Sequence, residues 1–274
     1  MVVERMNPFD DEGKIIGICG AEHVYRYMWA VEYLREQDYS GTILDCACGC
    51  GYGSKTISSI GQVIGIDKSM EALNTANKLY STQNTEFIQG DLDNEGLREI
   101  ITECGVEEFG AVVSFETLEH VVNPRSLLKQ FYNVLRPDGY LLCSVPNGAK
   151  EEREGGEFIN KYHLHSFSLD DITSLFEESG FVIDRVYGQS VFKIPLMWYR
   201  KIRQGISEKY LERCFAETEL PAKEEWSTRF KVLMWGIDRI CDNEHLAEAF
   251  FKPNNLLLSW GPNIVIAARK KQES

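Results

Sequence analysis

The sequence has few basic residues, no long apolar run and no apolar leader. No stretch of about 18 consecutive apolar residues occurs, so we expect no membrane-spanning helix and no membrane insertion. Residues 1–14 include acidic side chains and no apolar centre, which is not the pattern of a signal peptide. These absences predict a soluble, cytoplasmic protein.

Positive charge is also scarce, with 29 Lys and Arg against 42 Asp and Glu, a net charge of -13. A surface of this sign repels phosphate backbones, so no nucleic-acid partner is expected. The eight cysteines include no C-x2-C pair of the kind that holds structural zinc. Cys46, Cys48 and Cys50 alternate too closely for a disulfide framework, and we interpret them as reduced thiols.

Composition is that of a globular protein, 43% hydrophobic and 26% charged over 274 residues. Short apolar segments alternate with helical periodicity five times, which predicts a doubly wound, parallel α/β sheet. The predicted strands are residues 42–46, 63–67, 85–89, 110–115 and 140–145, followed by 181–187 and 263–268. The predicted helices are residues 21–36, one from residue 54, 70–79, 95–103, 125–135 and 169–179. A turn signal at residues 137–139 separates the helix over 125–135 from the strand over 140–145, and residues 148–165 are predicted as a loop.

We interpret residues 1–274 as one domain in four parts. Residues 1–40 form an N-terminal helical segment, and residues 41–189 form the core. Residues 190–255 form a helical, aromatic-rich insertion, and residues 256–274 hold the last strand and the tail. The insertion is either a lid over an acceptor pocket or a unit with its own core or dimer face, which leaves a homodimer open.

A small-residue loop follows the first predicted strand, with Ala47, Gly49 and Gly51 along it. Small residues let the backbone pass close to a ligand, with the next helix N-terminus aimed at it. Asp67 stands at the tip of the second strand, where a carboxylate can accept hydrogen bonds from ribose hydroxyls. Asp91, at the tip of the third strand, is placed to reach a nucleobase amino group. The pattern therefore predicts an adenosine site.

Two adenosine cofactors compete for this site. A nicotinamide dinucleotide uses G-x-G-x-x-G, but here the third glycine, Gly53, comes too early. Asp45 stands just before the loop, where it would repel a pyrophosphate. The same carboxylate suits a cationic ligand with an ammonium group, so the residues favour S-adenosylmethionine.

Five segments then resemble, in order, the motifs of class I S-adenosylmethionine-dependent methyltransferases. They are ILDCACGCGYGS, VIGIDKSMEAL, FIQGDLDN, FGAVVSFETLEHVVNP and LRPDGYLLCSVPN. The resemblance covers about residues 40–188 and resumes at the final strand. It departs from the family pattern at Ala47, which replaces the first motif glycine. It implies a Rossmann-like sheet of seven strands, six parallel and one antiparallel, with helices on both faces.

The resemblance also implies roles for individual residues. It places Asp45, Ala47, Gly49 and Gly51 around the methionine part of the cofactor. It places Asp67 with Lys68 at the ribose, Asp91 with Leu92 at the adenine, and Ser114 with Phe115 beneath the methyl group. Arg26 resembles an arginine of a narrower subgroup that pairs with the cofactor carboxylate. The alternative for Arg26 is a surface salt bridge.

Acceptor chemistry depends on a second group of residues. A hydroxyl acceptor needs a base, and the candidates are His120, His163 and Glu119. The E-x-x-E-H pattern resembles that of ubiquinone-pathway and small-RNA O-methyltransferases. It implies a divalent metal such as Mg²⁺ on Glu116, Glu119 and His120, with His165 or His163 as a further ligand. The alternative is a metal-free helix start, with His120 as pocket wall or base.

The acceptor itself is suggested only by resemblance. The stretch NKYHLHSF and the preceding GYGS motif are similar to those of enzymes of glycan biosynthesis. The resemblance implies a small-molecule acceptor, methylated on a hydroxyl of a polar or carbohydrate-like compound such as a glycan precursor. Methylation of nitrogen or carbon, and S-adenosylmethionine binding without catalysis, remain alternatives.

Overall fold

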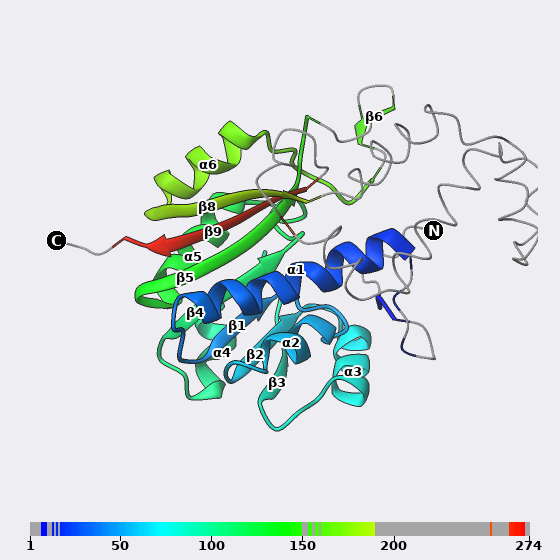
Figure 1. The fold of residues 1–274 in the computed structure, drawn as a ribbon, viewed down its shortest axis with the longest axis vertical. Helices are drawn as coiled ribbons and strands as arrows, with labels where there is room; N and C mark the ends of the chain where they lie inside the picture. Colours follow the sequence, from blue (N-terminus) through cyan, green and yellow to red (C-terminus); the bar gives the residue numbers. More distant parts are fainter. Residues whose placement is uncertain are drawn as a thin grey trace, which may run out of the picture.

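The computed structural model describes residues 7–9, 13, 15, 17–149, 153–154, 157–158, 160–189, 253 and 263–271. Figure 1 shows these residues as coloured helices and strands. Apart from Pro253, the insertion predicted at 190–255 lies outside the described residues. No helix within the described ranges is long and apolar enough to cross a bilayer.

A seven-stranded sheet forms the centre of the fold, in the order β3-β2-β1-β4-β5-β9-β8. Strands β1 to β5 pair in parallel, and β9 runs antiparallel to both β5 and β8. The strands are β1 (Ile43–Cys46), β2 (Val63–Asp67), β3 (Thr85–Gln89), β4 (Phe109–Phe115), β5 (Leu135–Pro146), β8 (Phe181–Gln189) and β9 (Asn263–Lys270). The prediction of six parallel strands and one antiparallel strand is therefore confirmed.

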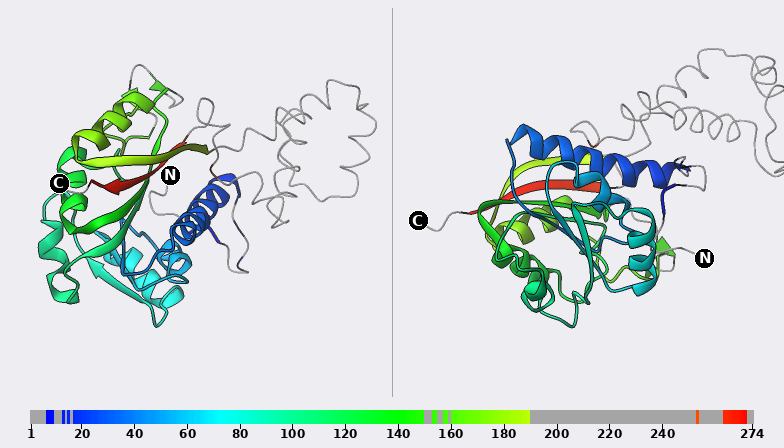
Figure 2. Two further views of the ribbon diagram at one scale, coloured as in Figure 1. Left: turned by 60° about the vertical axis from the view of Figure 1, so that its left-hand side comes forward. Right: turned by 90° about the horizontal axis from the view of Figure 1, so that it is seen from below.

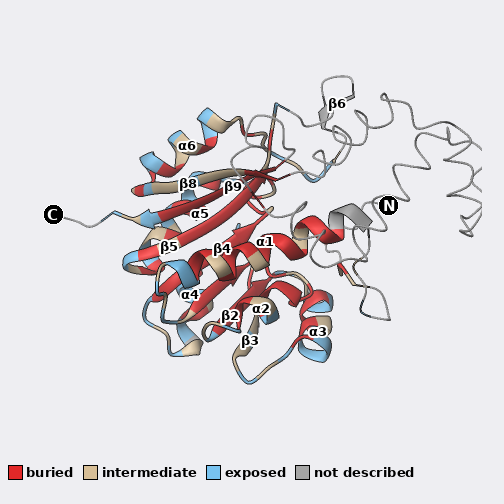
Figure 3. Ribbon diagram, viewed as in Figure 1, coloured by how far each residue is buried: buried red, intermediate tan, exposed pale blue. Residues whose placement is uncertain are grey.

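Helices cover both faces of this sheet (Figure 2). They are α1 (Gly17–Glu36), α2 (Tyr52–Ile57), α3 (Met70–Leu79), α4 (Leu97–Ile101), α5 (Pro124–Val134) and α6 (Leu169–Glu178). A short 3-10 helix, η1 (Thr102–Cys104), completes the segment predicted as one helix over 95–103. Apolar side chains of α1 and α2 form one core cluster, and those of α4, α5 and α6 form another. The central strands are buried between the two layers (Figure 3).

Side-chain caps set the helix starts. The Ser69 side chain accepts a hydrogen bond from the Ala72 N–H at the start of α3. Asn123 caps α5 in the same way, and Pro124 occupies the first turn, where its missing N–H costs nothing. Ser168 and Asp171 form a reciprocal capping box at α6.

Two local predictions are corrected by the structure. The turn signal at residues 137–139 was expected to separate a helix from a strand, but it lies inside β5. The register moves from Phe109–Leu135 to Ala111–Tyr140, so the extra residues bulge while Asp138 takes a φ of 59°. The segment 148–165, predicted as a loop, contains a two-stranded hairpin of β6 (Arg153–Glu154) and β7 (Glu157–Phe158).

The strand order reverses between β1 and β4, which lie side by side in the sheet although β2 and β3 come between them in the sequence. From these neighbours the chain crosses to opposite sides of the sheet, so a crevice opens at their carboxyl ends. This topology positions the site described below.

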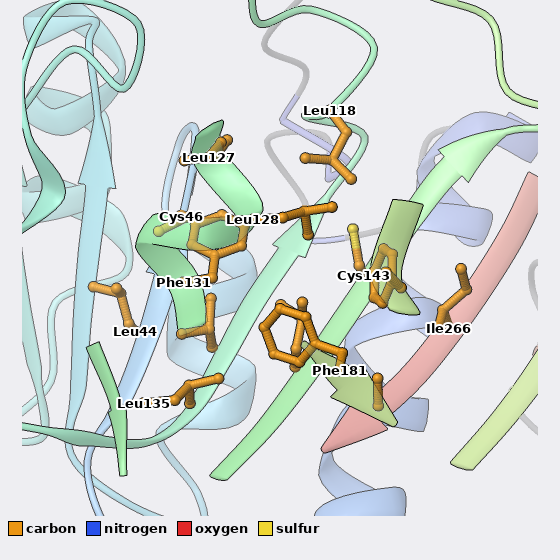
Figure 4. Packing of buried hydrophobic residues seen from close by; sticks show 14 of the residues in the cluster. Leu44, Cys46, Leu118, Leu127, Leu128, Phe131, Leu135, Cys143, Phe181 and Ile266 are labelled. Carbon is orange, nitrogen blue, oxygen red and sulfur yellow. The ribbon is translucent and has the colours of Figure 1, made fainter. Parts of the chain in front are cut away.

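Packing beneath the crevice depends on Phe131 of α5, which is fully buried among Leu44, Leu128 and other core residues (Figure 4). Replacing Phe131 by alanine is expected to lower the free energy of unfolding by about 3–5 kcal/mol, because it leaves a cavity in a close-packed core. Urea denaturation measures the loss. The matched control is Val122→Ala at a side chain that is 70% exposed, where we expect a change below about 0.5 kcal/mol. Equal losses in the two variants would contradict the packing described.

Candidate functional site

A cavity opens at the carboxyl ends of β1 and β4, where the topology predicts a ligand crevice. Its volume is about 930 Å³ including the open mouth. Of the predicted cofactor residues, seven line it: Ala47, Gly49, Asp67, Lys68, Asp91, Leu92 and Phe115.

The loop after β1 forms the floor of the cavity. Ala47 and Gly49 have φ values of 62° and 55°, in the left-handed region. A Cβ built on Gly49 would meet nothing within 4 Å, so this backbone borders open space. Gly51, at a φ of 84°, faces the other way, since a Cβ there would lie 2.6 Å from the Cβ of Ala76. Gly51 therefore shapes the loop from behind and does not line the cavity.

Asp67 ties this loop to the end of β2. One carboxylate oxygen accepts from the Gly49 N–H at 3.0 Å, and the other accepts from the Ser69 N–H at 2.8 Å. The side chain is buried but still borders the cavity. Each carboxylate oxygen has a further lone pair, so Asp67 can also accept from the hydroxyls of a ribose.

Asp91 and Leu92 follow β3 at the same edge of the cavity. A hydrogen bond from the Asn94 side chain, with one from the Asp93 N–H, holds the pKa of Asp91 below its usual value. The carboxylate therefore remains an acceptor at neutral pH. The apolar Leu92 side chain is suited to an adenine ring, and the Asp91 carboxylate is suited to accept a hydrogen bond from the adenine amino group.

Asp45 does not line the cavity, contrary to the placement that the resemblance implies. It is fully buried behind the wall, where it accepts from the Tyr27 hydroxyl at 3.0 Å and from Ser54 Oγ at 2.6 Å. Burial raises the pKa of Asp45 to about 6, while these two hydrogen bonds act to lower it and Asp67 to raise it. Asp45 therefore acts on the cavity through the ring of Tyr27. Ser114 is likewise fully buried in β4, and the next residue, Phe115, is the one that borders the cavity.

Arg26 is neither exposed nor part of the lining. It is 1% exposed, and its Nε donates to Gln189 Oε1 at 2.8 Å. Its Nη1 lies 3.1 Å from Glu116 Oε1. Arg26 therefore forms an ion pair, but this pair is internal, and the alternative of a surface salt bridge is wrong. Glu116 also accepts from Ser144 Oγ at 2.7 Å.

Glu116 itself borders the cavity, with a φ of 51°. Burial would raise the pKa of Glu116, but Arg26 and the Ser144 hydrogen bond act against it, and the pKa lies below the usual value. The carboxylate is therefore ionised. Because it is directed to Arg26 and Ser144, it stands apart from the other predicted metal ligands.

Three residues at the acceptor side come together instead. Ligand-capable atoms of Glu119, His120 and His163 all lie within 4.8 Å of one another. His120 borders the cavity, and its ring packs edge-on against His163 with centroids 4.9 Å apart. His165 turns away, because its Nε2 lies 3.0 Å from the Val121 carbonyl. The structure thus selects His163 over His165 as the partner of Glu119 and His120.

Backbone contacts explain this grouping. The Glu119 carbonyl accepts from the N–H groups of Leu164 and His165 at 2.7 and 3.2 Å. His120 Nδ1 donates to the Tyr162 carbonyl at 3.0 Å, because a carbonyl oxygen can only accept. The loop after β5 is thereby fixed against the loop after β4.

Sequence reasoning missed eight residues of the lining, which are His23, Tyr27, Cys48, Tyr52, Gly90, Asp93, Thr117 and Val121. His23 had a usable signal, since it precedes Tyr27 by one helical turn and so shares its face of α1. Tyr52 follows the glycine loop directly. Asp93 and Thr117 stand in loops whose direction depends on tertiary contacts, such as the Asp93 carboxylate accepting from the Val122 N–H.

Comparisons with known proteins agree with this geometry. A methyltransferase domain matches residues 21–186. A probable S-adenosylmethionine-dependent methyltransferase of Mycolicibacterium smegmatis is 24% identical over 66% of this chain and 68% of its own length. The mitochondrial ubiquinone biosynthesis O-methyltransferase of Bos taurus is 34% identical over 68% of this chain. The chain spans 54% of the length of that relative, and 45% of a Haemophilus ducreyi ubiquinone biosynthesis O-methyltransferase that is 36% identical.

Solved structures share the fold. An S-adenosylmethionine-dependent methyltransferase of Mesorhizobium loti superposes with a TM-score of 0.52 at 16% identity, covering 89% of this chain and 97% of its own. Haemonchus contortus phosphoethanolamine N-methyltransferase 2, solved with S-adenosyl-L-methionine, gives 0.52 at 17% identity, over 92% of this chain and 57% of its own.

Asp67 provides the first test of the site. Asp67→Ala is expected to weaken binding of S-adenosylhomocysteine at least about tenfold, because it removes the ribose acceptor and releases the Gly49 loop. Isothermal titration calorimetry measures the affinity. Asp184→Ala, on β8 beside Arg269, is the control and should bind as the wild type does. An unchanged affinity in the Asp67 variant would overturn the assignment.

Asp45 provides a test of the buried wall. Its folded-state pKa of about 6 lies above its ordinary value, so the folded protein binds the extra proton between about pH 4 and 6. Stability is therefore expected to fall as pH rises through this window. Asp45→Asn removes the charge, so relative to the wild type it should gain about 2 kcal/mol between pH 4.5 and 7. Denaturant titrations of both proteins at both pH values measure this difference, and a constant difference would contradict the prediction.

Proposed function

This chain belongs to the S-adenosylmethionine-dependent methyltransferases, and from that premise we propose that it methylates a hydroxyl oxygen of a small, uncharged polar acceptor. The carrying observation is the cluster of Glu119, His120 and His163 at the cavity. When bound, S-adenosylmethionine supplies a methyl group on a sulfonium, which is already a good leaving group. The chain's own task is to orient the acceptor and to accept its proton.

His120 is suited to accept that proton. Because Nδ1 donates to the Tyr162 carbonyl, a neutral His120 carries its lone pair on Nε2. Glu119 Oε1 lies 3.8 Å from this Nε2, and its side chain is 1% exposed. The acceptor hydroxyl would give its proton to Nε2 as its oxygen takes the methyl group, and the electron pair of the broken carbon–sulfur bond would stay on sulfur as a neutral thioether. The carboxylate of Glu119 then stabilises the imidazolium.

The charge of the lining supports an uncharged acceptor. Asp67, Asp91, Asp93 and Glu116 border the cavity, and Lys68 is the one Lys or Arg among its described lining residues. This surplus of carboxylates opposes a phosphate or carboxylate on the acceptor. Carboxylates also accept hydrogen bonds from several hydroxyls at once, which favours a carbohydrate-like compound.

A divalent metal is the second candidate for the same cluster. Glu119, His120 and His163 offer three ligand atoms of suitable type. The hydrogen bonds present favour the metal-free base, however. The Asn160 side-chain amide donates to His163 Nε2 at 2.7 Å, while Asn160 Oδ1 accepts from the Tyr162 N–H. His163 therefore keeps its proton on Nδ1, and binding a metal through either nitrogen would require that arrangement to change.

Replacement of His120 tests the proposal. We expect His120→Ala to lower the rate of methyl transfer by about 10²- to 10⁴-fold while S-adenosylhomocysteine affinity stays within about twofold. Transfer of radiolabelled methyl to a panel of sugars, polyols and phenols measures the rate. The control is Tyr162→Phe, since the contact of Tyr162 with His120 uses only its carbonyl.

Chelation separates the two candidates. The base mechanism predicts that the wild-type rate is unchanged by EDTA. Activity that disappears with EDTA and returns with Mg²⁺ would replace the base by the metal. Transfer to amines but not to hydroxyl compounds would overturn the acceptor class.

A further inference from the structure

His23 is a cavity residue to which the mechanism above assigns no task. It lies on α1, one turn before Tyr27, and both side chains border the cavity. Its ring lies edge-on to Tyr52, with the Tyr52 hydroxyl oxygen 3.1 Å from His23 Nδ1. The imidazole is thus held in one orientation by a neighbouring wall residue.

The surroundings of His23 determine its charge. Burial, reinforced by Arg26 and opposed by Glu116, lowers the pKa of His23 to about 4. Burial likewise raises the pKa of Tyr52, so the phenol keeps its proton. A protonated phenol beside a neutral imidazole donates to the ring nitrogen that carries the lone pair. Tyr52 then donates to Nδ1, and the imidazole proton lies on Nε2.

A neutral N–H donor at this position can bind the carboxylate of the cofactor. The methionine part of S-adenosylmethionine carries a carboxylate, which enters a cavity lined by carboxylates. Lys68 stands at the ribose end, beside Asp67 and close to Asp91. Arg26, which the sequence suggested for this carboxylate, is directed to Gln189 and Glu116 behind the lining. Two of the described lining residues belong to α1, His23 and Tyr27. The Tyr27 hydroxyl donates to Asp45, which leaves His23 to donate to a ligand carboxylate.

The Arg26–Glu116 pair makes this placement electrostatically acceptable. Glu116 alone would repel a ligand carboxylate near His23. Arg26, 3.1 Å from Glu116, carries the opposite charge and offsets that repulsion. The recognition then rests on a hydrogen bond, which is worth about tenfold or more in affinity when one partner is charged.

We propose that His23 recognises the carboxylate of S-adenosylmethionine through its Nε2–H, held in that tautomer by the Tyr52 hydroxyl. The proposal concerns the cofactor and does not rest on the acceptor assigned above. His23 would contact the ligand directly, as a residue that distinguishes the complete cofactor from analogues without the carboxylate.

Three variants of His23 and two ligands test this. The ligands are S-adenosylhomocysteine, which has the carboxylate, and 5′-methylthioadenosine, which lacks the whole amino-acid end. His23→Gln keeps an N–H at the position of Nε2, whereas His23→Asn offers one only near Nδ1 and His23→Met offers none. We expect S-adenosylhomocysteine to bind His23→Gln within about threefold of the wild type, and His23→Asn and His23→Met at least about tenfold more weakly. Methylthioadenosine should bind all four proteins within about twofold.

Calorimetry gives the affinities, and thermal melting shows that each variant is folded. Equal loss of both ligands in His23→Asn and His23→Met would mean a structural role and would overturn the proposal. Unchanged S-adenosylhomocysteine affinity in both would also overturn it. If His23→Met does not fold, the comparison of His23→Gln with His23→Asn still decides, since both keep a polar amide. Failure to find a hydroxyl acceptor leaves these binding results untouched.

Discussion

The internal ion pair between Arg26 and Glu116 connects four elements of the fold beside the cavity. Through Arg26 it joins α1 to β8 at Gln189, and through Glu116 it joins the end of β4 to β5 at Ser144. Removing either partner would leave a charge in a poorly hydrated place, which is costly, so the pair holds these elements in one arrangement. The left-handed backbone of Glu116 is kept by the same contacts, together with its N–H donating to the Ser144 carbonyl.

The carboxylates around the cavity lie in two different kinds of surroundings. Near the glycine loop, Asp67 accepts hydrogen bonds from backbone N–H groups, and Asp45 lies behind the lining and accepts from the Tyr27 hydroxyl. At the other end of the cavity, the buried carboxylate of Glu119 has its Oε1 3.8 Å from His120 Nε2. A buried carboxylate next to an imidazole favours protonation of the imidazole. A carboxylate that accepts hydrogen bonds from N–H groups instead stays ionised and acts as a fixed acceptor.

Much of the fold was accessible from the sequence because local patterns report it directly. Alternating strands and helices predict the sheet, and the loop around Gly49 with Asp67 predicts a nucleoside site. The helix ends agree with capping side chains such as Asn123 and Ser168. The turn signal at residues 137–139 failed for a physical reason: proline and glycine mark any break in regular pairing, and a bulge in a strand is one.

The sequence by itself determined the doubly wound α/β class of the sheet, the family, and residues of the cavity lining such as Ala47, Gly49 and Asp67. These depend on hydrophobic periodicity and on backbone conformations that only small residues adopt. Tertiary structure alone decided that His163 joins Glu119 and His120, that Arg26 meets Glu116, and that His23 reaches the cavity. Each of these depends on how loops and a helix from distant parts of the chain pack together. Spacing along a sequence carries no record of such contacts, because the direction of a loop is set by partners that lie far away in the chain.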